Sequence, residues 1–127
     1  MEHRVAYKVY YEDTDSLGVV YYANYLKYLE RGRTEWVGAQ GRPIQEWNRD
    51  GYNFVVYGLT MKFKQAARLG DLFEVVTSVT MSSAYRACFL QRVECRGVVL
   101  VEAEVDIVCV NHAQQLCEFP PLGQSGS

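Results

Sequence analysis

The sequence has no long apolar segment and no excess of positive charge. No uninterrupted apolar run approaches the ~18–20 residues that span a bilayer, and the N-terminal stretch, MEHRVAYKVYYEDTD, lacks the apolar centre of a signal peptide. The 13 lysines and arginines are spread along the chain against 15 aspartates and glutamates. Nucleic-acid binding requires concentrated positive charge. We therefore expect a cytoplasmic protein that neither inserts into a membrane nor binds nucleic acid.

Metal ligands and disulfide patterns are also scarce. The two histidines, His3 and His112, lie far apart near the ends of the chain, so a histidine-based metal site has few ligands to draw on. The four cysteines form no C-x-x-C pair and lie mostly in strand-like segments. A reduced cysteine in such a segment behaves as a small buried apolar residue. We expect inert thiols, no metal and no cofactor.

What remains is the composition of an ordinary globular protein. The chain has 127 residues, of which 49% are hydrophobic and 22% charged, which matches one domain and argues against disorder. We expect a single domain over residues 1–127. The part from about residue 112 to 127 contains Pro120, Pro121 and several small polar residues, and it is expected to be a flexible tail.

The spacing of apolar residues predicts the order of the elements. Residues 4 to 11 alternate in the way of a half-buried strand. Apolar residues at helical spacing follow between Tyr22 and Val37, and two glycines and Pro43 then stop the helix before a short helical turn near residues 45 to 47. From residue 53 onward the alternation of strands returns in four successive segments. The predicted order is β-α-β-β-β-β.

This order favours one architecture. Four consecutive strands joined by short turns are largely antiparallel, and a long helix with an apolar face needs a sheet to cover it. We therefore expect an α+β fold in which an antiparallel sheet wraps around one long central helix. Such a sheet leaves an unpaired edge, which soluble proteins commonly remove by symmetric pairing. At least a dimer is expected.

The densest polar feature consists of Glu12, Asp13 and Asp15, between the first predicted strand and the start of the helix. Unpaired backbone N–H groups and the helix dipole favour negative charge there, including a developing oxyanion. A carboxylate beside such a helix start can act as a nucleophile or as a base for water. From the residues alone, the alternative is that Asp13 or Asp15 only caps the loop or the helix.

Two longer segments carry a family resemblance. Residues 11 to 26, YEDTDSLGVVYYANYL, and residues 28 to 35, YLERGRTE, resemble the hot-dog-fold acyl-CoA thioesterases of the 4-hydroxybenzoyl-CoA thioesterase family, most closely its Tol–Pal-associated branch. The resemblance extends over about residues 5 to 111. It implies a hot-dog fold that hydrolyses an acyl-CoA thioester to the free acid and CoA without a metal or redox cofactor. It also implies a homodimer or homotetramer with sites at the dimer interface.

The resemblance also implies roles for two residues. Asp15 matches the catalytic aspartate of the family, which acts as a nucleophile or as a base for water. Tyr22 matches the residue at the helix start whose backbone N–H polarises the thioester carbonyl. The Tol–Pal branch usually carries a histidine at this position, whereas tyrosine resembles the 4-hydroxybenzoyl-CoA enzyme. The acyl group, aromatic or short-chain, therefore stays open.

Three further residues are candidates for substrate binding. CoA carries phosphates, so an acidic chain needs local cations, and Lys64 and Arg68 lie close in sequence at a predicted strand end. Tyr25, with the other tyrosines at the helix start, would suit an aromatic acyl group by stacking. Solvated lysines and core tyrosines are the alternatives. Because binding and hydrolysis share a pocket, the alternative function is a non-catalytic hot-dog domain that binds acyl-CoA or acyl-carrier thioesters.

Overall fold

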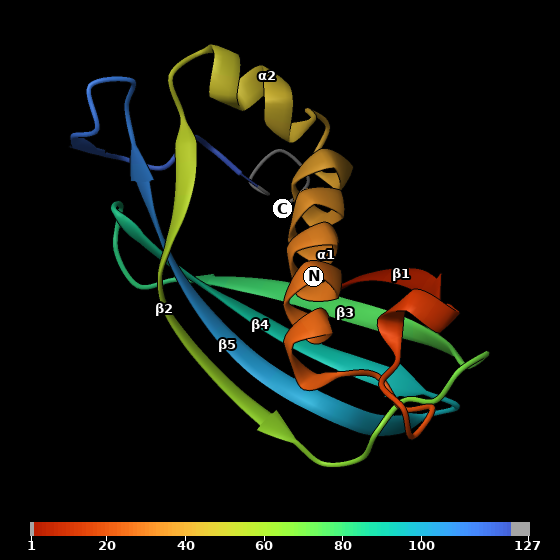
Figure 1. Cartoon of the computed structure of the whole chain (residues 1–127). Helices are drawn as coiled ribbons and strands as arrows, with labels where there is room; N and C mark the ends of the chain where they lie inside the picture. Colours follow the sequence, from red (N-terminus) through yellow and green to blue (C-terminus); the bar gives the residue numbers. More distant parts are fainter. Residues whose placement is uncertain (1, 123–127) are drawn as a thin grey trace.

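A long central helix and a curved antiparallel sheet form the fold in the computed structural model, which describes residues 2 to 122 (Figure 1). The long strands are β1 (His3–Lys8), β2 (Asn53–Phe63), β3 (Leu72–Met81), β4 (Arg86–Cys95) and β5 (Val98–Val110). They lie in the order β1-β3-β4-β5-β2, each antiparallel to its neighbour, and the short β6 (Leu116–Cys117) pairs with β5. Helix α1 (Tyr25–Ala39) lies on the concave side of the sheet and is followed by α2 (Ile44–Arg49). The predicted α+β class is confirmed, and so is the predicted order of elements from β1 to β5, whereas β6 was not predicted.

One face of α1 packs on the sheet. Tyr22 and Leu26, which the helical spacing predicts on this face, are exposed instead. Tyr22 belongs to the short 3-10 turn η2 (Tyr22–Asn24), whose tighter winding changes the periodicity before α1 begins, and Leu26 is turned away from the buried face. The residues of α1 that are buried recur every three or four positions: Tyr25, Tyr28, Leu29, Gly32, Trp36 and Val37.

Neither helix within residues 2 to 122 is long and apolar enough to cross a membrane.

A glycine allows α1 to approach β3 and β4 closely. A Cβ atom at Gly32 would lie 2.5 Å from Cγ1 of Val75, so no side chain fits there without a shift. Beside this contact, Nε2 of Gln91 donates hydrogen bonds to the backbone oxygen of Leu29 at 2.9 Å and to Oγ1 of Thr77 at 3.0 Å. Gln91 and Thr77 are buried, and these bonds offset the cost of removing them from water. The contact therefore fixes where the helix lies on the sheet.

Strand β1 is shorter than the alternation predicts. The predicted strand covers residues 4 to 11, but β1 ends at Lys8 and the chain forms a 3-10 turn, η1 (Tyr11–Asp13). Oδ2 of Asp13 accepts the Tyr10 N–H at 3.0 Å, and the Asp13 N–H donates to the Tyr10 oxygen at 3.0 Å. Local side-chain bonds of this kind compete with the strand ladder. They turn the acidic loop toward the start of α1.

The chain after β5 returns to the sheet. A flexible tail is expected from about residue 112, yet β6 pairs with β5, and the ring of Phe119 stacks on Phe54 with 5.8 Å between centroids. Pro120 is buried. The described part of this segment therefore packs on the domain. Residues 123 to 127, which also belong to the expected tail, lie outside the described residues.

Candidate active site

Asp15 lies in a tight loop between η1 and η2. The Asp15 N–H donates to the Val19 oxygen at 2.9 Å, and Oδ1 of Asp15 accepts the Leu17 N–H at 2.8 Å. Within residues 2 to 122, Oδ2 of Asp15 receives no hydrogen bond and the carboxylate has no ion-pair partner. Asp15 is exposed. The loop thus holds the carboxylate by one oxygen and leaves the other open to a reacting molecule.

The Asp15 loop is fastened to the segment before β3. The Val20 N–H donates to the Ala67 oxygen at 2.8 Å, and the hydroxyl of Tyr25 accepts the Ala67 N–H at 3.1 Å. An isolated bridge joins Val19 to Arg68. These bonds bring two predicted site residues, Tyr25 and Arg68, beside the loop that carries Asp15.

The N–H of Tyr22 is the first in η2, which runs directly into α1. The first N–H groups of a helix have no acceptor within the helix, and this one finds none elsewhere in the described part of the chain. The dipole of α1 adds positive potential at this end. An anionic oxygen can therefore be stabilised at the Tyr22 N–H.

A pocket of about 270 Å³ opens beside the start of the helix. Three predicted site residues, Tyr22, Tyr25 and Lys64, line it together. Asp15 and Arg68 are not among its lining residues; they lie on the loops that adjoin it. The remaining lining residues are Val20, Phe63, Gln65 and Ala66.

Phe63 also lines the pocket, although it is not among the predicted site residues. Its ring centroid lies 6.1 Å from that of Tyr22 and 5.8 Å from that of Tyr25, and half of the residue is exposed. Aromatic rings at these separations attract one another. The sequence shows only that Phe63 is an apolar residue at the end of a predicted strand, directly before Lys64. Its contact with Tyr22 and Tyr25 could not be predicted, because these residues are distant in sequence.

The two predicted cations differ in their surroundings. Nζ of Lys64 lies 3.1 Å from Oε1 of Glu102, and both side chains are about half exposed. Exposed pairs of this kind contribute little free energy, so Lys64 can exchange partners readily. The guanidinium of Arg68 has no ion-pair partner within residues 2 to 122, and its backbone N–H donates to Oδ2 of Asp71 at 2.9 Å. Both side chains are accessible to an anion.

Asp13 is the only buried acidic residue in the part of the chain that the structure describes. Its carboxylate accepts hydrogen bonds from the Tyr10 N–H and from the ammonium group of Lys27. Burial raises the pKa of Asp13, but the Lys27 ammonium, the nearby Tyr28 hydroxyl and the Tyr10 N–H together hold this pKa below its ordinary value. The hydroxyl of Tyr28 is buried and makes no well-formed hydrogen bond. The sequence indicates a cap at Asp13, but it does not reveal the link to Lys27.

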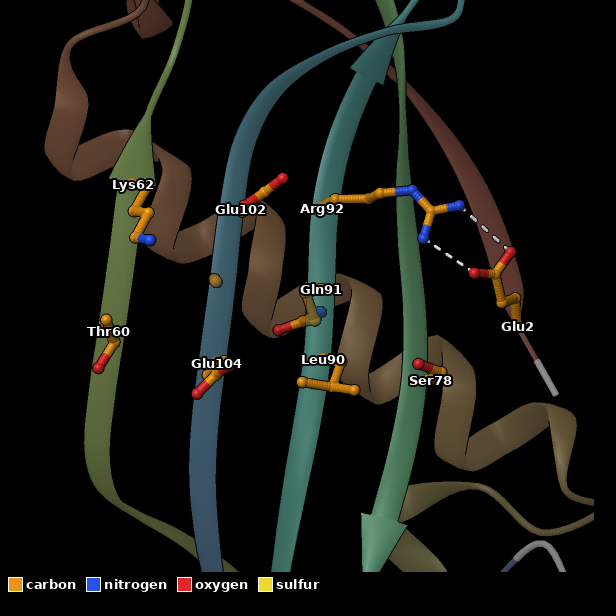
Figure 2. Close-up of a pocket in the computed structure, with 10 residues that line it drawn as sticks. Glu2, Thr60, Lys62, Ser78, Leu90, Gln91, Arg92, Glu102 and Glu104 are labelled. Carbon is orange, nitrogen blue, oxygen red and sulfur yellow. Dashed lines mark hydrogen bonds and ion pairs between the residues drawn. The ribbon is translucent and has the colours of Figure 1, made fainter.

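A second hollow, of about 590 Å³, lies on the outer face of the sheet, with α1 behind the strands (Figure 2). Charged side chains surround it, and some are already paired, as Arg92 is with Glu2 at 2.8 Å. Neither Asp15 nor Tyr22 lines it. Among residues 2 to 122, no three His, Cys, Asp or Glu side chains are grouped closely enough to hold a metal ion. The pocket at the helix start is therefore the better candidate site.

Known proteins match most of the chain. A family model described as the thioesterase-like superfamily matches residues 9–124. The acyl-CoA thioester hydrolase YbgC of Escherichia coli is 40% identical over 105 residues, which cover 82% of this chain and 78% of that protein. The acyl-CoA thioesterase YbgC of Haemophilus influenzae is 38% identical over 105 residues, which cover 82% of this chain and 77% of that protein.

Solved structures share the fold. A probable thioesterase from Bartonella henselae superposes with a TM-score of 0.89 at 29% identity, covering 94% of this chain and 100% of that one. A 1,4-dihydroxy-2-naphthoyl-CoA thioesterase from Synechocystis has a TM-score of 0.86 at 22% identity, covering 94% of this chain and 90% of that one. The hot-dog fold expected from the sequence is confirmed.

Proposed function

Because the chain belongs to the thioesterase-like superfamily, we propose that it hydrolyses an acyl-CoA thioester to the free acid and CoA at the pocket beside the start of α1. One observation carries the proposal. Asp15 has an open carboxylate oxygen in a loop held next to the helix start, where the Tyr22 N–H has no acceptor within residues 2 to 122. Hydrolysis needs a group that attacks or activates water and a donor for the oxyanion. Asp15 and Tyr22 supply one each.

The proposed reaction uses these two groups together. The thioester carbonyl oxygen accepts the Tyr22 N–H, which stabilises the charge that develops on it in the transition state. The Asp15 carboxylate either attacks the carbonyl carbon, giving an anhydride that water then cleaves, or takes a proton from an attacking water molecule. In both routes the carbon–sulfur bond breaks and CoA leaves as a thiolate, which takes a proton from water in the first route and from the protonated Asp15 in the second. Asp15 is therefore required in either case.

The surroundings of the pocket suggest the class of substrate. The rings of Tyr22 and Phe63 lie edge to face at its wall, which suits stacking with an aromatic acyl group, and a short-chain acyl group can pack on the same rings. Lys64 and Arg68 are accessible beside it and are suited to the phosphates of CoA. The relatives from Escherichia coli and Haemophilus influenzae are both named for acyl-CoA substrates, which supports CoA as the thiol.

We further propose that the protein works as a homodimer or homotetramer with sites at the dimer interface. The two outer strands of the sheet, β1 and β2, differ. β1 has six residues and carries charged side chains such as Arg4 and Lys8, which protect an edge. β2 has 11 residues and exposes apolar side chains along its length: Val55, Val56, Tyr57 and Leu59. A long apolar edge favours pairing with a second copy.

Release of free thiol from acyl-CoA esters tests the proposed hydrolysis. Benzoyl-, 4-hydroxybenzoyl-, short-chain and long-chain esters would be offered to wild type, Asp15→Asn and the control Asp50→Asn, whose carboxylate pairs with Arg42 away from the pocket. Wild type and the control should turn over at least one ester. Asp15→Asn should lose at least the ~10²–10³-fold in kcat that follows removal of one oxyanion donor.

Two results would contradict the proposal. Unchanged turnover in a folded Asp15→Asn protein would exclude the mechanism. Binding of CoA esters by wild type without any thiol release would favour the non-catalytic binding domain instead. The ester with the highest kcat/KM separates the aromatic from the short-chain class.

A further inference from the structure

We propose that Asp13 is a positioning residue, whose buried carboxylate and backbone oxygen hold the Asp15 loop and the Tyr22 N–H in their working arrangement. This inference rests on the proposed function, because it concerns the two groups that carry the chemistry. Asp13 itself does not contact the pocket beside the helix start. It acts through its neighbours in the chain.

The backbone oxygen of Asp13 ties the loop to the helix start. It accepts the Tyr21 N–H at 3.1 Å and Nδ2 of Asn24 at 2.9 Å. Tyr21 directly precedes the proposed oxyanion donor Tyr22, and Asn24 ends η2. The two hydrogen bonds that this oxygen accepts therefore fix the position of the Tyr22 N–H relative to the acidic loop.

The buried side chain of Asp13 makes a second connection, between the end of β1 and the first turn of α1. Its carboxylate is bonded on one oxygen by the Tyr10 N–H, where β1 has ended, and on the other by Lys27 in the first turn of α1. The carboxylate is 4% exposed and the Lys27 side chain 35%. A buried charge is costly unless it is paired, so the low exposure of Asp13 strongly disfavours arrangements that separate it from Lys27.

The position of Asp13 in the chain gives these ties a catalytic consequence. Asp15 is two residues further along, and its loop closes at Val20 by bonding to the segment around Ala67. Asp13 is one end of the loop that carries Asp15, and its backbone oxygen holds the other end through the Tyr21 N–H. A misplacement of about 1 Å can cost on the order of 10² in rate. Loss of the Asp13 ties should thus slow the chemical step more than substrate binding.

The test compares variants that remove the ties in different ways. Asp13→Ala removes both side-chain bonds, Asp13→Asn keeps an acceptor for the Tyr10 N–H but loses the charge, and Lys27→Met removes the ammonium. Asp50→Asn is the matched control, because it removes a carboxylate from an exposed ion pair with Arg42. Each variant is assayed for kcat and KM in thiol release, with thermal melting as a check of folding.

We expect kcat to fall about 10- to 100-fold in Asp13→Ala while KM changes less than threefold. Lys27→Met and Asp13→Asn should each lower kcat, and the double variant should lose less than the product of the two losses, because it leaves no unpaired charge. Asp50→Asn should behave as wild type. A folded Asp13→Ala protein with wild-type kcat, or a loss confined to KM, would overturn the inference.

Hydrogen exchange supplies a readout that does not need activity. Peptides covering residues 10 to 24 should exchange faster in Asp13→Ala than in wild type, because the backbone oxygen that accepts the Tyr21 N–H is no longer held in place by the side-chain bonds of residue 13. Peptides of β4 should be unchanged. Unchanged exchange in residues 10 to 24 would overturn the positioning role. If wild type releases no thiol from any ester, the proposed hydrolysis fails, and exchange alone then decides whether Asp13 fixes the loop.

Discussion

The backbone and the side chain of Tyr22 have separate parts in the proposed reaction. Tyr21, the preceding residue, has φ −63° and ψ 132°, the region that a residue before proline adopts. Proline is also tolerated at the first position of a helix, where its missing N–H breaks no helical bond. Tyr22→Pro can therefore remove the proposed oxyanion donor with little strain.

We expect Tyr22→Pro to lower kcat for thiol release by ~10²–10³-fold with its melting temperature nearly unchanged. Tyr22→Ala, which loses the ring as proline does but keeps the N–H, should lose far less. A folded Tyr22→Pro protein with wild-type turnover would show that another group stabilises the oxyanion. Because proline also lacks the ring, the aromatic side chain of Tyr22 would then be dispensable as well.

At the scale of elements, the approach of α1 to the sheet depends on one glycine. A Cβ atom at Gly32 would meet Cγ1 of Val75 at 2.5 Å, Nε2 of Gln91 at 3.1 Å and Oγ1 of Thr77 at 3.2 Å. Gly38, in the same helix, has nothing within 4 Å of its Cβ position. Gly38→Ala is the control, because it adds the same methyl group to α1 without a close contact.

We expect Gly32→Ala to lower the free energy of unfolding by about 1–3 kcal/mol through overpacking. Gly38→Ala should raise it by about 0.4–1 kcal/mol, because alanine restricts the unfolded chain. Urea denaturation of both variants measures the difference. Equal stabilities would mean that the helix shifts to accommodate the methyl group, and a fall in kcat with Gly32→Ala would then report that shift at the helix start.

At the scale of the whole molecule, the free edge of β2 predicts the oligomer. Light scattering should give wild type a mass of at least twice the 14.5 kDa of one chain. The double variant Tyr57→Glu, Leu59→Glu brings like charges together at a paired edge and should shift the mass toward one chain. Val98→Glu is the control, since it also charges an exposed apolar position but lies at the start of β5, where it pairs with Cys95 of β4 and is not on the free edge of β2.

If the site requires both copies, the β2 double variant should lose thiol release together with its oligomeric mass. A variant that is a monomer by light scattering yet turns over at the wild-type rate would show that one chain holds a complete site. A variant that remains a dimer would show that pairing uses another surface. The oligomeric mass and the rate of thiol release are measured on the same preparation.

Much of the architecture follows from short-range patterns. Alternation and helical spacing predict the order of strands and helix because each depends on the geometry of a single element. Where two local tendencies compete, the pattern alone is insufficient. β1 ends at Lys8 because Asp13 bonds back to Tyr10, and Tyr22 is exposed because the helix begins with a tighter turn.

The sequence by itself determined the element order, the buried face of α1 apart from its first turn, and Asp15 as the residue to test, since these depend on periodicity and on a contiguous motif. Only the tertiary structure decided which distant residues meet. Lys27 reaches Asp13, Phe63 lies against Tyr22, and Gly32 touches Val75. These contacts join elements whose separation in sequence carries no information about distance, because packing of the helix on the sheet determines which of them come together.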